Sequence, residues 1–215
     1  MRPVVIEKNT ILKATIAYSA EHGLENVSAM KIARSIGISD ATIFNNFGSM
    51  ASLFAECLYY IDRKIDACLA STPLTSPEMS HVSHELWLSY FNYLVDNNRD
   101  AKFYRQMRHS SYYSDDVISH ELQTYEFFSD FVGKNTHLIE ANQYTMWTYI
   151  IENTLNFAIR VADGRFKSDS DSVDSYYRLV FFGLNGIAWA KSSICTLSPV
   201  RTKPAKVQKP EWFSV

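Results

Sequence analysis

Residues 28–47 hold the side chains and spacing with the clearest chemical meaning in this sequence. Ser28 and Ser39 each precede a short stretch of helical spacing, and Gly37 between the two stretches permits a tight turn. Two short helices joined in this way form a helix-turn-helix, in which the second helix enters the major groove of DNA. The chemistry that this segment predicts is hydrogen bonding to phosphates and to base edges.

Four side chains of the segment suit contacts to the DNA backbone. Ser28, together with the amides at the start of its helix, can hold a phosphate. Lys31 and Arg34 can flank the groove, and Asn46 can donate an amide hydrogen bond near the end of the second helix. These residues would fix the position of the protein on DNA without reading its sequence.

Base reading is expected from the second helix. Asn45 is suited to adenine, Asp40 can accept a hydrogen bond from cytosine, and Ala41 and Thr42 can contact a thymine methyl group. The complete set of predicted DNA-binding residues is Ser28, Lys31, Arg34, Ser39, Asp40, Ala41, Thr42, Phe44, Asn45 and Asn46.

Little positive charge is available for DNA. The chain has 21 Lys and Arg against 23 Asp and Glu, a net charge of −2, so any attraction must come from a local patch. Residues 1–50 contain five cations and four acids, a net charge of +1. Because each neutralised phosphate adds to affinity through counterion release, we expect weak binding with a shallow salt dependence.

The remaining composition narrows the class of protein. The 215 residues, 47% of them apolar and 14% aromatic, suit one or two globular domains with a sizeable core. The three cysteines have neither disulfide nor zinc spacing, which fits a reducing cytosol, and no apolar run reaches the ~20 residues of a membrane span. His81 and His84 lack further ligands at metal spacing, and enzyme motifs are missing. We expect a cytoplasmic protein that is not an enzyme and uses no metal or cofactor.

Helical spacing recurs along the whole chain, whereas alternating strand patterns are weak. The expected fold is all-α: an N-terminal three-helix helix-turn-helix head is joined to a larger helical bundle. The predicted domains are the head (1–48), the body (49–197) and an extended basic tail (198–215). Helices are predicted over residues 6–22, 29–35, 40–47, 50–70, 78–97, 99–110, 115–133, 140–163 and 171–195.

The head resembles the TetR family of repressors. The stretches ILKATIAYSAEHG, SAMKIARSIGIS and DATIFNNFGSMASLF carry the resemblance over residues 10–54, with Ile32-Ala33, the turn Gly37-Ile38-Ser39 and Phe47 in matching order. The resemblance implies a one-component repressor that binds double-stranded operator DNA as a homodimer. It also implies release from DNA by a hydrophobic small-molecule effector, which the middle helices would hold.

Four positions depart from the family pattern. The family usually has Gly where Ala41 stands, Tyr where Phe44 stands, His where Asn46 stands and Lys where Met50 stands. The last three of these family residues commonly reach DNA phosphates, so we expect an atypical grip on DNA. An alternative is that the chain is a helical ligand-binding or protein-interaction module with weakened or lost DNA binding. A small all-α enzyme is a further alternative.

The body is predicted to hold a ligand site and a dimer interface. Residues 84–128 are rich in rings, which suits a pocket for a mostly apolar molecule. The ligand candidates are Trp87, Phe91, Tyr104, Met107, Tyr125, Phe128 and Trp147. The last two long helices carry broad apolar stripes beside small residues, and the interface candidates are Trp147, Ile151, Thr154, Tyr177, Val180, Phe181, Leu184 and Ile187. Helix 50–70 is expected to transmit ligand binding to the head.

Overall fold

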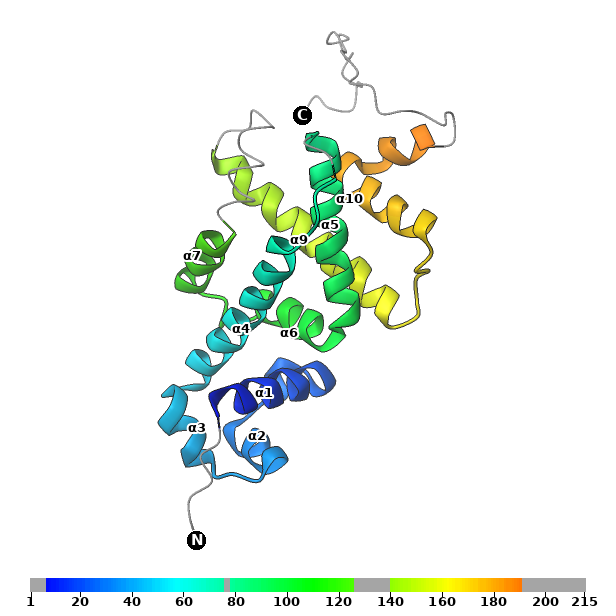
Figure 1. Ribbon diagram of the computed structural model, residues 1–215. Helices are drawn as coiled ribbons and strands as arrows, with labels where there is room; N and C mark the ends of the chain where they lie inside the picture. The colour runs from blue at the N-terminus through cyan, green and yellow to red at the C-terminus, as the bar shows by residue number, and fades with distance from the viewer. Residues whose placement is uncertain (1–6, 76–77, 126–139, 191–215) are drawn as a thin grey trace, which may run out of the picture.

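The computed structural model describes residues 7–75, 78–125 and 140–190 of the chain, without the side chains of residues 79, 140–143 and 184–190 (Figure 1). Within these ranges the regular structure is entirely helical, as predicted. The elements are α1 (Lys8–His22), η1 (Leu24–Asn26), α2 (Ala29–Ile36), α3 (Asp40–Phe47), α4 (Met50–Ala70), α5 (Met79–Asp96), α6 (Asn98–Arg108), α7 (Asp115–Thr124), α9 (Glu140–Ala162) and α10 (Ser170–Ala190).

The head consists of α1, α2 and α3, at the lower end of the molecule in Figure 1. The side chains of Ser28 and Ser39 accept hydrogen bonds from backbone amides in the first turns of α2 and α3, as the cap pattern predicts. Gly37 ends α2 with φ 71°, a left-handed conformation that other residues rarely adopt. These caps and this glycine fix the angle between the two short helices.

The buried face of α1 differs from the predicted one. Helical spacing predicts one apolar face made of Ile11, Ala14, Ala17 and Tyr18; Ile11 is buried as predicted, but the other three side chains are only partly buried. The buried face instead includes Thr15 and Ser19, whose hydroxyls donate to backbone carbonyls one turn earlier at 2.8 Å. Because those bonds satisfy the hydroxyls inside the helix, two polar residues can occupy the core at little cost.

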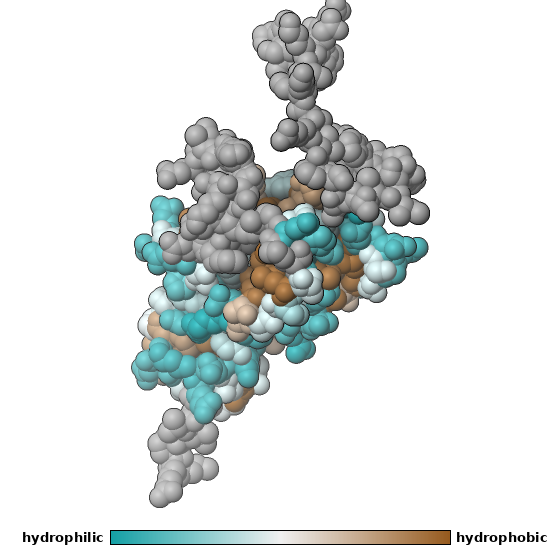
Figure 2. Space-filling model, turned by 45° about the horizontal axis from the view of Figure 1, so that its top comes forward, coloured by the Kyte–Doolittle hydropathy of each residue, from teal (hydrophilic) through white to brown (hydrophobic). Residues whose placement is uncertain are grey.

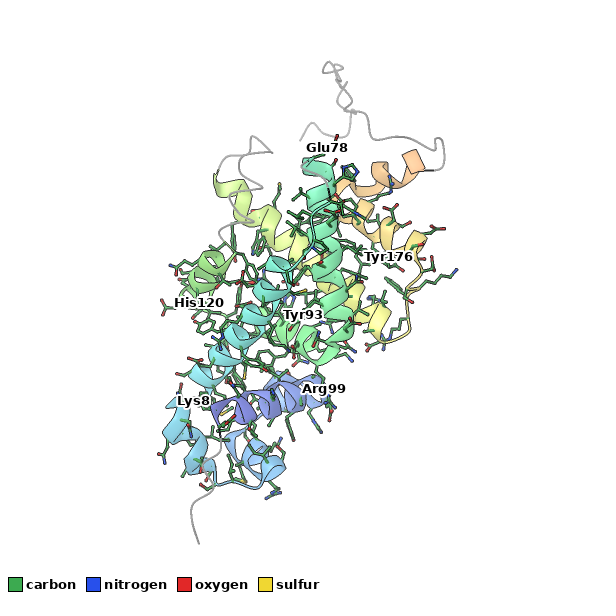
Figure 3. All side chains as sticks on the ribbon, viewed as in Figure 1. Lys8, Glu78, Tyr93, Arg99, His120 and Tyr176 are labelled. Carbon is green, nitrogen blue, oxygen red and sulfur yellow. The ribbon has the colours of Figure 1, made fainter. Side chains whose placement is uncertain are left out.

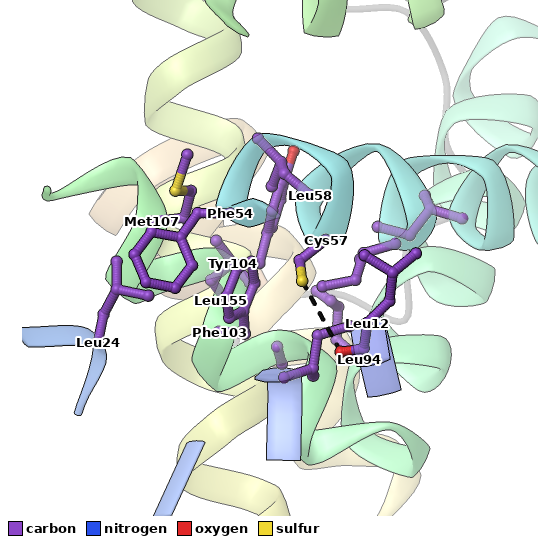
Figure 4. Close-up of a cluster of buried hydrophobic side chains, with 14 of the residues drawn as sticks. Leu12, Leu24, Phe54, Cys57, Leu58, Leu94, Phe103, Tyr104, Met107 and Leu155 are labelled. Carbon is purple, nitrogen blue, oxygen red and sulfur yellow. Dashed lines mark hydrogen bonds between the residues drawn. The ribbon is translucent and has the colours of Figure 1, made fainter. Parts of the chain in front are cut away.

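Helix α4 runs from the head into the body (Figure 1). Its buried side chains contact both parts. Near its start, Phe54 packs against Phe103 of α6 with ring centroids 6.5 Å apart. One turn further, the Cys57 thiol donates to the carbonyl oxygen of Leu12 at 3.7 Å (Figure 4). Head and body therefore share one continuous apolar core.

The body is a bundle in which α9 packs against α5 and α6, while α10 packs against α9 and α5. Helix α6 lies directly above α1 in Figure 1, and the two helices are in extensive contact. Apolar surface is visible in patches between hydrophilic residues (Figure 2). No helix in the described part of the chain is long and apolar enough to span a membrane.

Two predicted helices differ from what was expected. The helix predicted over 115–133 ends at Thr124, and residues 126–139 lie outside the described part. The helix predicted over 171–195 is described as far as Ala190, the last described residue, and it is kinked at Gly183, whose φ of 63° and ψ of −159° are not helical. The predicted C-terminal tail also lies outside the described residues.

Candidate functional site

The predicted recognition helix, α3, has one buried and one exposed face. Ile43 and Phe47 are buried in the core of the head. On the other side, Asp40, Ala41 and Asn45 are exposed, and the Phe44 side chain is 45% exposed. The sequence therefore builds an eight-residue helix whose free face carries an acidic, a small, an aromatic and an amide side chain, and the acid and the amide can hydrogen-bond to base edges.

Three polar side chains of this region are engaged within the head. The Asn46 amide donates to the carbonyl oxygen of Thr42 at 2.8 Å, and the Thr42 and Ser39 hydroxyls lie 2.9 Å apart. Thr42 is half-buried, unlike the other predicted base-reading residues, and Asn46, predicted to contact the DNA backbone, is half-buried as well. Their contacts to DNA would have to share or replace these internal bonds.

The predicted backbone contacts lie on and before α2. The Lys31 ammonium group donates to the carbonyl oxygen of Asn26 at 2.8 Å, so it points back towards η1. The Ser28 hydroxyl accepts from the Lys31 amide at 3.4 Å. Arg34 is exposed. The site thus has the predicted residues close together, but its lysine is held by a backbone carbonyl.

A further cation was missed by the sequence reasoning. The Lys8 ammonium group lies 5.6 Å from the centre of the Phe47 ring, at the end of α3 (Figure 3). A cation over an aromatic face is attracted by the ring quadrupole. Sequence spacing gave no signal for this contact, because Lys8 begins α1 and Phe47 ends a different helix.

In the body, six of the seven predicted ligand-contacting residues are buried in the core. Trp87 and Phe91 stack with ring centroids 5.0 Å apart, and Tyr125 and Trp147 pack at 5.2 Å. Tyr104 and Met107 are also fully buried. The predicted Phe128 lies outside the described residues.

A polar cluster in the same interior was not predicted. The Arg108 side chain of α6 donates to both carboxylate oxygens of Glu121, at 2.7 and 2.8 Å, and to Glu152 of α9 at 2.8 Å. Glu121 also accepts hydrogen bonds from the hydroxyls of Tyr104 and Tyr113. Burial is the main reason that the pKa of Tyr104 is well above its usual value. The cluster joins α6, α7 and α9 through charge-assisted hydrogen bonds.

Asp62 of α4 lies beside this cluster and is 0% exposed. One carboxyl oxygen, Oδ1, accepts from the Tyr125 hydroxyl at 3.0 Å. Burial, and then the nearby charge of Glu121, raises the pKa of Asp62 to about 8. The carboxyl is therefore mostly protonated at neutral pH, which explains how an acid can be kept inside the bundle.

The predicted dimer-interface residues have mixed positions. Thr154 and Ile151 are buried within the protomer, where the Thr154 hydroxyl accepts from the Trp87 indole at 2.9 Å. Tyr177 is also buried, and its hydroxyl lies 2.9 Å from that of Ser83. The other predicted members are Trp147 and Val180, which are buried, Phe181, which is half-buried, and Leu184 and Ile187, whose side chains lie outside the described part.

A different part of the α9 and α10 surface is open to solvent. Tyr149 is 48% exposed and Phe182 is 54% exposed. Between the two helices there is a hollow of about 200 Å³, lined by Tyr149, Asn153, Phe157, Leu179, Val180 and Gly183. The kink at Gly183 therefore forms part of an apolar depression on the surface of the body.

The two histidines considered for a metal have separate partners. The His81 ring lies 3.3 Å from the Glu78 carboxylate, whereas His84 lies 3.9 Å from that of Asp174. No group of three potential metal ligands occurs among the residues that the structure describes.

The sequence of the head matches a known family. Residues 11–57 match the model described as bacterial regulatory proteins, tetR family. Among curated proteins, none is similar enough in sequence to count as a match.

Solved structures extend the similarity to the whole fold. A TetR family transcription regulator from Marinobacter aquaeolei VT8 is 16% identical, with a TM-score of 0.68 over 80% of this chain and 92% of that chain. A protein from Shewanella sp. PV-4 assigned to the same family is 15% identical, with a TM-score of 0.72 over 81% and 95%. The fatty acid degradation regulator FadR from Bacillus halodurans is 18% identical, with a TM-score of 0.63 over 83% and 100%.

These findings define the chain at two levels. Its fold is that of the TetR family transcription regulators, with a helix-turn-helix head and a helical body. Its N-terminal segment, residues 11–57, matches the model of the tetR family of bacterial regulatory proteins and contains the helix-turn-helix.

Proposed function

We propose that the chain is a transcriptional repressor that binds operator DNA as a homodimer and leaves it when a small-molecule effector occupies the body. The observation that carries this proposal is the free face of α3 within a tetR family head. The exposed Asn45 and Asp40 side chains have the donors and acceptors needed to distinguish bases in a major groove.

A homodimer follows from the geometry of such recognition. One head reads only a few base pairs, so two heads on successive turns of DNA are needed for a specific site. The exposed rings of Tyr149 and Phe182, beside the hollow between α9 and α10, supply an apolar surface suited to a second copy. The buried members of the predicted interface would support this surface from within the protomer.

Effector control would use two routes from body to head. Helix α4 carries Cys57, which is bonded to α1, and its lower part packs on α6. Helix α6 also touches α1 directly and is linked to it by the Arg99–Glu21 ion pair at 2.8 Å. A ligand that shifts either helix would change the spacing of the two heads. FadR of Bacillus halodurans is named as a fatty acid degradation regulator, an example of metabolic control in this fold.

The second candidate is a ligand-responsive module whose DNA binding is weak. It is favoured by the internal hydrogen bonds of Lys31 and Asn46, which reduce the groups free to hold DNA. The half-buried, uncharged Met50 adds no phosphate contact at the start of α4.

A fluorescence-anisotropy titration with DNA selected by the protein separates these candidates. Lys31→Ala and Thr42→Ala should each weaken binding, whereas Lys167→Ala and Thr124→Ala, matched changes in the body, should not. Losing Lys31 should also reduce the slope of log affinity against log salt by about one per head. Unchanged affinity in both head variants would contradict this docking of α2 and α3.

A further inference from the structure

Among the residues that the structure describes, the buried polar atoms without a hydrogen-bond partner include one on α4 and one on α5. Oδ2 of Asp62 forms no hydrogen bond with any residue that the structure describes, although the side chain is 0% exposed. The hydroxyl of Tyr90, on α5, is also buried and unpartnered among the described residues. Asp62 is on α4 and Tyr90 is on α5, two helices that pack against each other. Native proteins rarely leave such atoms unsatisfied, because each costs about 1–3 kcal/mol.

The charges around Asp62 come from every helix that faces it. Arg63 is on the same helix, Tyr90 is on α5, and Arg108 is on α6. Glu121 is on α7, and Tyr125 follows that helix directly. Glu152 of α9 and Tyr104 of α6 complete the neighbourhood, since both interact electrostatically with members of the same group.

This neighbourhood is unsuited to an anionic ligand. Arg108 is the cation at the centre of the cluster, and its side chain is only 2% exposed. Its guanidinium already donates to Glu121, Glu152 and Tyr113. An entering carboxylate or phosphate would compete with these bonds and would meet the acidic side chains of Glu121 and Glu152, which Arg108 already pairs. Like charges in a low-dielectric interior repel strongly.

A ligand with a cationic hydrogen-bond donor suits this interior better than an anion, because the unpaired atoms are oxygens that can accept hydrogen bonds. An ammonium group has three donors and no acceptor, so it can donate to buried oxygen atoms without partners, such as Oδ2 of Asp62 and the hydroxyl oxygen of Tyr90. The surrounding rings, including Trp87, Phe91 and Trp147, offer apolar surface for the rest of such a molecule.

We propose that Asp62 and Tyr90 are the recognition point for an organic amine that binds as its ammonium ion with an apolar body among the rings. This inference deepens the proposed function and rests on it, since it assigns the chemical class of the effector. The side chains that would surround the ligand are buried against one another, so binding requires them to move. That requirement couples occupancy of the site to a change in the bundle, as a sensor needs.

Binding of the ammonium ion requires the ionised form of Asp62. The carboxyl transfers its proton to solvent, and its negative charge pairs with the ligand, whose own protons all stay in place. Because burial raises the pKa of Asp62 to about 8, close to one proton should be released per ligand at pH 7. Affinity should rise by up to about tenfold per pH unit from pH 6 towards pH 8.

Isothermal titration calorimetry with three matched compounds tests the proposal on the full chain. These are 4-phenylbutylamine, 4-phenylbutan-1-ol and 4-phenylbutanoate, which share an apolar body and differ in the polar group. The amine should bind at least tenfold more tightly than the alcohol, and the carboxylate should bind most weakly. Titrations in phosphate and in Tris, which differ in ionisation enthalpy, should reveal the released proton.

Variants assign the effect to the two residues. Asp62→Asn should weaken amine binding at least tenfold and abolish proton release, whereas Asp66→Asn, an exposed acid on the same helix, should change neither. Tyr90→Phe should weaken amine binding while retaining proton release, which provides a test independent of any instability of the first variant. The proposal is overturned if the amine does not bind, if the carboxylate binds as tightly, or if Asp62→Asn keeps wild-type affinity.

The DNA titration distinguishes failure of this inference from failure of the proposed function. A protein that binds selected DNA but not the amine is a regulator with another class of effector. A protein that binds the amine but no DNA keeps the site and refutes the role of repressor. The expected result is amine binding together with a lower affinity for DNA when the amine is present.

Discussion

Replacing Asp62 with Asn should change how the stability of the protein depends on pH. Burial, and then the charge of Glu121, raises the pKa of Asp62 from 3.8 to about 8 in the folded protein. Below pH 3.8 the carboxyl is protonated in both the folded and the unfolded state, so it costs nothing there. As the pH rises further, the unfolded state loses its proton first, and the folded state becomes progressively less stable until the pH reaches about 8.

The size of this effect follows from the difference between the two pKa values. Each pH unit within this window corresponds to about 1.4 kcal/mol. At pH 7 the buried carboxyl therefore costs roughly 4 kcal/mol relative to low pH, a large part of the ~5–15 kcal/mol that stabilises a typical domain. Asparagine carries no titrating proton and still offers an oxygen to the Tyr125 hydroxyl. The unfolding free energy of Asp62→Asn minus that of the wild type should therefore increase by roughly 3 kcal/mol between pH 5 and pH 7.

Urea unfolding of both proteins, followed by tryptophan fluorescence, measures this difference. Protein concentration must be the same throughout, because the proposed dimerisation would make apparent stability depend on concentration. Asp66→Asn is the control, since that side chain is exposed on the same helix and should give a difference that does not vary with pH. The reasoning is refuted if the difference between wild type and Asp62→Asn is also constant from pH 5 to pH 7.

Three further changes should have distinct effects. Gly37→Ala should destabilise the protein by about 1 kcal/mol, measured by urea unfolding, because φ at this position is 71°; an unchanged midpoint would argue against the tight turn. Arg108→Met should cost about 3–5 kcal/mol by leaving Glu121 buried without its cation, whereas the double variant Arg108→Met and Glu121→Gln should recover part of that loss. Phe44→Tyr should strengthen DNA binding in an anisotropy titration by adding a hydroxyl to an exposed ring, and weaker binding would place this ring away from the backbone.

The head could be predicted in detail because its signals are local. Ser28 and Ser39 cap α2 and α3, Gly37 forms the turn, and each lies within a few residues of the element that it shapes. The buried face of α1 was missed because hydrophobic spacing ignores Thr15 and Ser19, whose hydroxyls are satisfied by their own helix. Local patterns predict caps and turns, but they do not predict buried polar residues whose hydroxyls are hydrogen-bonded within their own helix.

The body was harder to predict because its contacts join distant segments. Arg108 meets Glu121 and Glu152, which lie 13 and 44 residues further along the chain. No local pattern specifies which charges will share an interior. The apolar stripe of α9 was visible in the sequence, but periodicity could not tell whether Thr154 and Ile151 face a partner or their own protomer, where the structure buries them.

Selection of bound sequences from a random DNA pool at low salt tests the central claim most directly. Full-length protein should enrich inverted half-sites whose centres lie one helical turn of DNA, about 10 base pairs, or a multiple of it apart. Asn45→Ala should relax the base preference at one position in each half-site, with a loss of about 1–3 kcal/mol in discrimination against the wrong base. If neither the wild type nor the variant carrying Asn46→His and Met50→Lys enriches any sequence, the chain is not a DNA-binding regulator.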